Sequence, residues 1–302
     1  MSQQRNEISR VPVIGFVRYS QSIIFGTGKN ARDVFEEEYF EYRFKIFKNV
    51  TLKSFQQQTD NNFALLVLHS INMPPHYKMR FLELEKTNLF LYNIFVEDTA
   101  ESFNDAIKKS IDYVSFQSEA AITFRIDNDD AVQHDFIQKL RSFTKKDFVG
   151  YSINVPNVTI LKRIANHSYM VEERYYHSNS IGLAYVTGKD PYKTILQVAE
   201  HDKINDENPL ILLPKNKVSV LMTINGENAI NYINPANAKI LKKEEFDKYL
   251  KERKFESLDL HCLRVFDEIN NSSNFSLKKI IGLFVPPVIN LALLKIKKLF
   301  FS

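Results

Sequence analysis

The sequence predicts an α/β protein with a mostly parallel sheet flanked by helices. Three observations predict this class. Short apolar runs alternate with helical segments through the first half of the chain, one of these runs has no polar face, and acidic residues directly follow the last of them. The 302 residues are 44% hydrophobic and 25% charged, as in ordinary globular proteins, so the chain can form a large core.

The elements of the first half can be placed in order. Residues 11–19 are expected to form a strand, and residues 31–58, which lack Pro and Gly, one or two helices. Residues 63–68 are continuously apolar, which is typical of a central parallel strand. A helix should follow Pro74 and Pro75, because proline is well tolerated in a first helical turn. The remaining expected elements are a strand at 89–96, a helix at 102–111, a strand at 120–124 and a helix at about 132–141.

The second half alternates less regularly. Residues 147–155 and 159–161 are expected to pair as a hairpin, and a polar and aromatic loop should follow at 172–180. No linker composition marks a domain boundary, so we expect one continuous domain over residues 1–275. The remaining expected elements are a helix at 191–200 and a strand at 218–224.

The last segment, residues 276–302, differs from the rest. Lysines flank its apolar residues, and Pro286 and Pro287 interrupt any helix, so a membrane-spanning helix is not predicted. We expect a basic amphipathic segment that lies on an anionic inner-membrane surface. The alternatives are a helix docked on the domain itself or a dimer contact.

Charge and cysteine content exclude several classes of protein. A formal charge of +4 and a pI near 8.8 are only mildly basic, so nucleic acid is not an expected partner. Cys262 is the only cysteine, which excludes an intramolecular disulfide and a cysteine-based zinc site. Residues 1–10 have no apolar run typical of a secretion signal. We therefore expect a cytoplasmic protein, peripheral on the inner membrane face.

An acidic segment, Arg125-Ile126-Asp127-Asn128-Asp129-Asp130, follows the strand expected at 120–124. Ligands of open α/β sheets bind outside the carboxyl ends of the strands, so these carboxylates should project into a crevice. They need water, a basic partner or a cation, because burying an unpaired ion costs several kcal/mol. Hard oxygen ligands suit Mg²⁺ or Mn²⁺. The alternative is a polar turn that ends the strand and caps the next helix.

Three segments together resemble a known family. The first, Arg-Ile-Asp-Asn-Asp-Asp-Ala-Val at 125–132, resembles the acidic signature of GT-A fold glycosyltransferases. More narrowly, it resembles the bacterial "putative rhamnosyl transferase" family, whose members carry a similar Arg-Leu-Asp-Asp-Asp-Asp-Ala-Leu stretch. Residues 51–63 look like the helix that enters that family's second strand, and Asn225-Gly226-Glu227-Asn228 is similar to its late His-Gly-x-Asn element. The resemblance covers most of residues 11–235.

This resemblance implies a GT-A fold, Rossmann-like as in nucleotide-diphospho-sugar transferases, with a donor-nucleotide half at about 11–147 and an acceptor half at 148–275. It implies transfer of a sugar from a nucleotide-sugar donor to an acceptor hydroxyl. By position, Asp127 would contact the donor and help to hold Mn²⁺ or Mg²⁺, and Asp129 would be the main metal ligand. Asp130 would be a further ligand or a helix cap. Asn225 stands where relatives often have His, so it would be a weaker metal ligand.

Further donor contacts can be named. Arg18 and Arg125 could bind the diphosphate or base, because arginine offers a bidentate fork, although each could instead form a surface ion pair. Gly182 lies in a segment similar to the one that passes beneath the donor sugar, where glycine permits close backbone approach. Residues 65–70 end without the aspartate that many GT-A enzymes use to read uracil, so the nucleotide stays open.

The resemblance also indicates where a catalytic base would lie. An inverting transfer needs a group that takes the proton from the attacking hydroxyl. Relatives of this type place it at the start of a helix downstream of the metal motif. Asp202 matches that position, Glu200 is the second candidate, and His201 is a third because its ordinary pKa is about 6.5. Alternatively, these residues are a solvated helix end.

One hypothesis and two alternatives result. The hypothesis is a metal-dependent inverting glycosyltransferase acting at the inner membrane face on a glycan or lipid-linked acceptor of the bacterial surface, such as lipopolysaccharide, O-antigen or capsule. A sugar-nucleotide nucleotidyltransferase is the first alternative, and Gly-Thr-Gly-Lys at 26–29 is the only trace of its phosphate loop. The second is a calcium-dependent carbohydrate-binding module that uses Asp127, Asp129 and Asp130.

Overall fold

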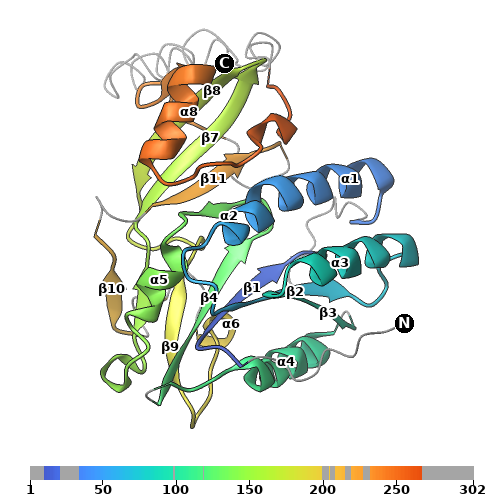
Figure 1. Cartoon of the computed structure of the whole chain (residues 1–302), viewed down its shortest axis with the longest axis vertical. Helices are drawn as coiled ribbons and strands as arrows, with labels where there is room; N and C mark the ends of the chain where they lie inside the picture. The colour runs from blue at the N-terminus through green and yellow to red at the C-terminus, as the bar shows by residue number, and fades with distance from the viewer. Residues whose placement is uncertain are drawn as a thin grey trace, which may run out of the picture.

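The protein is described here by a computed structural model. It describes residues 10–20, 34–97, 99–117, 119–198, 204, 208–214, 219–226 and 232–266. These residues form two sheets with helices packed around them, and the smaller sheet lies at the top of Figure 1.

The larger sheet has seven strands, and six of them run in one direction. Only β9 is antiparallel to its neighbours, β4 and β6. The sheet order is β10 (Leu210–Leu212), β6 (Ser152–Asn154), β9 (Ala184–Gly188), β4 (Ala120–Asp127), β1 (Val13–Arg18), β2 (Ala64–Ser70) and β3 (Leu91–Val96). A mostly parallel sheet flanked by helices is the class that the sequence predicts, so that prediction is confirmed.

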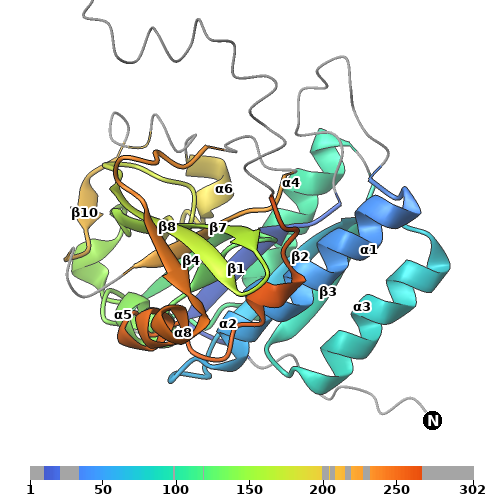
Figure 2. The ribbon, with the colours of Figure 1, turned by 90° about the horizontal axis from the view of Figure 1, so that it is seen from above.

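Helices cover both faces of this sheet (Figure 2). On one face lie α1 (Glu37–Ile46), a π-helical turn (Phe47–Thr51), α2 (Leu52–Gln56), α3 (Pro75–Thr87) and α5 (Phe136–Arg141). On the other lie α4 (Ala100–Lys109), continued by a 3₁₀ turn (Ser110–Tyr113), and α6 (Ile195–Val198).

The strand pattern explains these layers. In β1, Val13 and Val17 pack with the α1 and α3 side chains, whereas Ile14 and Phe16 pack with those of α4 and α6. This alternation follows from the two-residue period of a strand. All seven residues of β2 are buried, as expected for a central parallel strand covered on both faces.

The smaller sheet has five strands in the order β12 (Lys239–Lys242), β8 (Ser168–Tyr175), β7 (Asn157–Ala165), β11 (Val220–Ile224) and β5 (Ala131–Val132). Its β11 runs parallel to β7 and antiparallel to β5. Helix α8 (Lys243–Glu252) packs on it, with the Phe246 ring stacked 3.9 Å from that of Tyr169. Two further 3₁₀ turns are Lys146–Phe148 and Leu260–Cys262.

Two predictions for the second half are wrong. The expected hairpin of 147–155 with 159–161 does not form, because β6 lies in the larger sheet and β7 pairs with β8 and β11. The loop expected at 172–180 is partly a strand, because β8 continues to Tyr175. Its polar residues are compatible with the sheet since Arg174 pairs with the buried Glu172 at 2.7 Å.

Two expected helices have different bounds. The helix expected at 132–141 begins at Phe136, because Ala131 and Val132 pair with β11 as β5. Of the helix expected at 191–200, the described residues contain Ile195–Val198. The other expected strands and helices of the first half, and the strand at 218–224, are present, with ends shifted by a few residues.

Both expected halves, 11–147 and 148–275, contribute strands to the larger sheet. β6, β9 and β10 come from the second half but extend the sheet of the first half. Segment 276–302 lies outside the described residues. Among the residues that are described, no helix is long and apolar enough to cross a membrane.

Candidate active site

The acidic segment lies at the carboxyl end of β4, beside the middle of the larger sheet. Asp127 is the last residue of β4, and Arg18, the last residue of β1, is its neighbour in the parallel register. Asp127 is 45% exposed at its side chain, and Arg125 Nη2 lies 4.0 Å from its carboxylate. The predicted edge therefore presents an accessible carboxylate that is near Arg125 of its own strand and next to Arg18 of β1 in the strand register.

Strand β11 fixes the turn that follows. Because β5 pairs with β11, the end of β11 lies directly against Asp129 and Asp130. The Thr223 hydroxyl donates to the Asp129 carbonyl oxygen at 2.7 Å, and the Thr223 N–H donates to Asp130 Oδ1 at 3.2 Å. Asn225 Nδ2 donates to Asp129 Oδ2 at 2.8 Å. The predicted residues Asp129 and Asn225, far apart in sequence, are thus in direct contact.

Helix α1 closes the same cluster from the other side. Arg43 donates to Asn128 Oδ1 and, through Nη1, to the Tyr39 hydroxyl at 2.8 Å. The Tyr42 hydroxyl donates to the Asn225 carbonyl oxygen at 3.1 Å and accepts the N–H of Arg264 at 3.0 Å. One helical turn therefore contacts both the acidic turn and the end of β11.

The electrostatics of the cluster depend on burial and on Arg43. Burial raises the pKa of Asp129, and the nearby Asp127 raises it further, whereas the Arg43 guanidinium and the Asn225 hydrogen bond oppose the shift. Burial and the two neighbouring carboxylates raise the pKa of Asp130 well above its usual range. Asp130 is 3% exposed and bonded to β11, so it supports the turn and is not the cap of α5.

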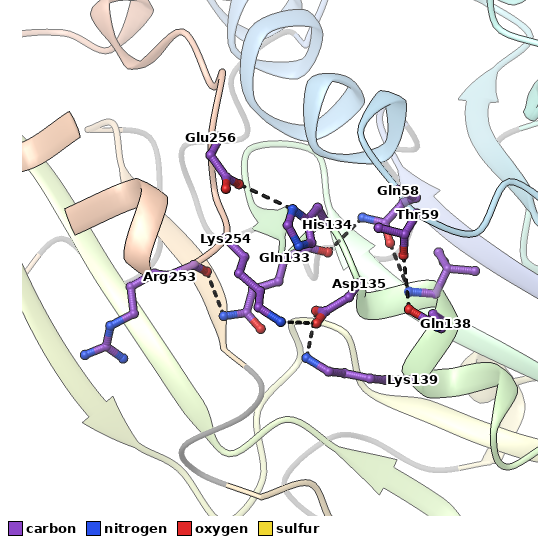
Figure 3. A network of polar contacts seen from close by, with 11 residues as sticks. Gln58, Thr59, Gln133, His134, Asp135, Gln138, Lys139, Arg253, Lys254 and Glu256 are labelled. Carbon is purple, nitrogen blue, oxygen red and sulfur yellow. Dashed lines mark hydrogen bonds and ion pairs between the residues drawn. The ribbon is translucent and has the colours of Figure 1, made fainter. Parts of the chain in front are cut away.

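A polar network fixes the chain immediately after this turn (Figure 3). Asp135 pairs with Lys139 of α5 and with Lys254, which follows α8. Gln133 Nε2 donates to the Arg253 carbonyl oxygen at 2.7 Å. The segment that leads away from Asp130 is therefore held by contacts with both α5 and the end of α8.

The remaining predicted residues are placed less completely. Gly182 has a φ of +71°, which favours glycine, and a Cβ there would lie 3.1 Å from the Phe136 ring. Its N–H donates to the Arg125 carbonyl oxygen at 2.9 Å, so it lies beside the acidic edge. Glu200, His201 and Asp202 lie outside the described residues.

The donor set can be compared with the needs of a divalent cation. Within the described ranges, no three His, Cys, Asp or Glu side chains group closely enough to hold a metal ion. A Mg²⁺ ion, however, commonly takes only one or two protein carboxylates and completes its shell with water and substrate phosphates. Asp129, oriented by Asn225, and the exposed Asp127 fit that smaller requirement.

Sequence reasoning did not identify Arg43, Tyr42 or Thr223. Arg43 and Asn128 are 85 residues apart, and Tyr42 and Asn225 are 183 apart. Arg43 and Tyr42 belong to a helix whose charged residues otherwise resemble a solvated surface, so no local pattern distinguishes them. Threonine is common in strands, so Thr223 does not stand out in the sequence of β11.

Comparisons with known proteins identify the family of the chain. A family model described as "putative rhamnosyl transferase" matches residues 13–237. No curated protein matches the chain.

Several solved structures are similar to the chain at low identity. A structure of S. aureus TarS 1-349 in complex with UDP has 14% identity and a TM-score of 0.39, covering 92% of this chain and 76% of that one. Another structure of S. aureus TarS has 15% identity and a TM-score of 0.39, covering 92% of this chain and 46% of that one. A glucose-1-phosphate thymidylyltransferase of Bacillus anthracis in complex with a sucrose has 8% identity and a TM-score of 0.29, with coverages of 85% and 99%.

The family match spans most of the chain and includes both the acidic segment and its partner Asn225. The protein is a glycosyltransferase and belongs to the family described as "putative rhamnosyl transferase".

Proposed function

We propose that the protein is a metal-dependent, inverting glycosyltransferase that moves a sugar from a nucleotide-sugar donor to a hydroxyl of a bacterial surface glycan. The observation that carries the proposal is the contact of Asp129 with Asn225, beside the exposed Asp127 and opposite Arg43. These groups come from three separate elements and meet where parallel strands end, which is where α/β sheets bind ligands.

The donor would bind along this edge. Asp127 would accept hydrogen bonds from the ribose or the sugar, because its side chain is 45% exposed, whereas Asp130 is buried. Arg18 and Arg125 would contact the diphosphate, since a guanidinium matches phosphate oxygens in a bidentate way. Gly182 would let the backbone approach the donor closely. A Cβ at this position would also crowd the Phe136 ring.

Asp129 would hold Mn²⁺ or Mg²⁺, with Asp127 as a second ligand. When bound, such an ion stabilises the negative charge that grows on the leaving diphosphate. Asn225 would act mainly by fixing the Asp129 carboxylate, and Arg43 would keep that carboxylate ionised by its positive charge. Asp130 would hold the turn against β11.

The acceptor hydroxyl would lose its proton to Asp202, with Glu200 and His201 as the other candidates for the base. The helix that precedes them, α6, is anchored to β4, because the Thr123 hydroxyl oxygen accepts the Ile195 N–H at 2.8 Å. The base segment therefore follows an element fixed to the strand that carries Asp127. Residues 276–302 would bring this site to the anionic inner membrane surface, where the acceptor would be a lipid-linked or growing glycan.

The test is a panel of nucleotide sugars with uracil, thymine and guanine bases, with and without Mn²⁺ or Mg²⁺. Release of nucleoside diphosphate from one donor, dependent on the metal and lost in Asp129→Asn, is expected. Full activity in the presence of a chelator would show that the metal assignment is wrong. Formation of a nucleotide sugar from sugar phosphate and nucleoside triphosphate would instead identify a nucleotidyltransferase.

A further inference from the structure

A hollow lies at the opposite edge of the seven-stranded sheet. It has a volume of about 1030 Å³ and is bounded by the end of α2, the segment leading into β2 and the segment leading into β3. Since β1 to β4 run parallel, residues that precede these strands lie at the edge remote from Asp127 and Asp129. Five amide side chains line it, which defines the "amide hollow": Gln56, Asn61, Asn62, Asn88 and Gln138.

Part of the hollow is held in place by hydrogen bonds. Gln56 Nε2 donates to Asn88 Oδ1 at 2.9 Å, and Asn88 Nδ2 donates to the Leu84 carbonyl oxygen at 2.7 Å. Elsewhere in the lining, the Thr59 hydroxyl donates to Gln138 Oε1 at 3.3 Å (Figure 3). The Thr59 N–H donates to the His134 carbonyl oxygen at 2.8 Å. Its walls are therefore preorganised, which lowers the entropy cost of binding a ligand.

The described lining of the amide hollow carries no net charge. Among these lining residues Asp60 is the only charged one, and Arg141 neutralises it through Nε and Nη2. Arg141 Nη2 also donates to the Asn62 carbonyl oxygen at 2.8 Å. Among the described residues that line the hollow, there is no lysine or arginine to bind a phosphate or nucleotide.

Apolar side chains complete the lining. Leu89 is 82% exposed, and the Phe90 ring lies 4.8 Å from that of Phe63. Tyr92 also contributes to the wall. Uncharged polar groups beside aromatic and aliphatic surface suit a ligand that alternates hydroxyls with C–H faces. An amide both donates and accepts, and so does a hydroxyl.

We propose that the amide hollow binds a segment of uncharged glycan, apart from the catalytic site. The ligand class follows from the chemistry of the lining. Hydroxyls of the glycan would bond to the amides, its C–H faces would pack on Leu89 and the aromatic rings, and it would carry no charge. A chain held there would keep a glycan substrate or product attached to the protein between transfers. Binding itself requires neither the donor nor the metal, so it can be tested independently of the proposed function.

The experiment measures binding of the full chain, without nucleotide sugar or metal, to oligosaccharides of dextran, mannan, galactan and rhamnan. Alginate oligosaccharides serve as a charged comparison. We expect binding to at least one neutral glycan and none to alginate. Leu89→Glu and Asn61→Ala should each weaken it by about tenfold or more. Both residues are exposed, so their variants should melt as the wild type does.

Matched controls come from exposed positions of the smaller sheet region. Ile240→Glu repeats the Leu89 change, and Asn237→Ala repeats the Asn61 change, and both should bind as the wild type does. Asp129→Asn should lose transfer yet bind glycan normally, so failure of one proposal is distinguishable from failure of the other. The proposal is overturned if no neutral glycan binds, if alginate binds equally well, or if Leu89→Glu and Asn61→Ala bind as tightly as their controls.

Discussion

The two edges of the seven-stranded sheet differ in the kind of polar group that they gather. At the carboxyl edge, three carboxylates lie in one turn, Arg43 lies near Asp129, and hydrogen bonds from β11 and the residue after it hold Asp129 and Asp130. At the amino edge, amides bond to one another and to nearby backbone, and the ion pair among its described residues is Asp60 with Arg141. One edge concentrates charge, and the other is neutral.

If both proposals hold, this difference lets one sheet serve two kinds of ligand. Carboxylates close together repel one another when ionised. In the free protein the positive charge of Arg43 offsets this repulsion at Asp129, and a bound cation would offset it further when substrate binds. The amino edge groups no like charges, and its buried amide Asn88 has the neutral partners Gln56 and the Leu84 carbonyl oxygen. The acidic cluster and the amide hollow therefore lie about one strand length apart. For the seven residues of β2 that length is roughly 23 Å.

The largest predicted effect tests the charged edge directly. Asp129→Asn keeps the size of the side chain and removes its charge, so we expect kcat/KM for transfer to fall by about 100-fold or more. Steady-state kinetics with saturating Mn²⁺ would measure it. The exposed Asp112→Asn is the control and should keep full activity. Equal rates in the two variants would mean that the charge at 129 has no part in transfer.

A second prediction concerns the cation of this edge. Arg43→Met removes the donor to Asn128 and the positive charge near Asp129, so transfer should fall by about tenfold or more and stability by about 1–3 kcal/mol. Arg43→Lys keeps the charge but not the fork, and should retain more activity than Arg43→Met. Transfer rates and urea unfolding of the two variants would measure this. Identical losses of activity would contradict a role for the charge.

The same contrast explains what could be predicted from sequence. The strands and helices of the first half are visible because local apolar runs and their periodicity mark them. The bounds of α5 and the partners of β6 were missed because β5 pairs with β11, and β6 with β9 and β10, across long separations. No local pattern contains such a pairing.

The site shows the same limit. Asp127 and Asp129 were predicted because they share one short acidic segment, and Asn225 was identified through the family resemblance. Arg43 and Thr223 were missed because their roles exist only once α1 and β11 meet the turn. A charged residue on a helix is ordinarily solvent-exposed, and only tertiary packing reveals the exception.

A third prediction compares two strand ends at the same carboxyl edge. β4 ends in carboxylates, whereas near the end of β2 His69 is buried, with its ring 4.3 Å from that of Phe81 and Nε2 bonded to Asn93 at 2.9 Å. Burial lowers the pKa of His69 to about 3, although the Asn93 hydrogen bond opposes the shift. The folded state therefore keeps this ring neutral where the unfolded state, with a pKa of about 6.5, binds a proton.

The sign of the effect follows. This contribution to stability is fully present above pH 6.5 and is lost progressively as the pH falls from about 6.5 toward about 3. As the pH is lowered through that range, the unfolding free energy of His69→Gln should fall less steeply than that of the wild type, by about 1 kcal/mol per pH unit. Urea unfolding at a series of pH values measures the slope, with the exposed His76→Gln as control. Parallel slopes for wild type and His69→Gln would contradict the assignment.

The smallest predicted effect tests whether the charged edge depends on the chain beyond α8. The Tyr42 hydroxyl joins the Asn225 carbonyl oxygen to the N–H of Arg264, whose guanidinium lies 4.2 Å from the Tyr42 ring. Tyr42→Phe keeps the ring contact and removes both hydrogen bonds, so stability should fall by about 1 kcal/mol. Transfer should fall only a few-fold, because Asn225 Nδ2 still contacts Asp129. The exposed Tyr232→Phe should change neither quantity. A loss of transfer as large as that of Asp129→Asn would mean that Asn225, positioned by Tyr42, participates in transfer beyond orienting Asp129.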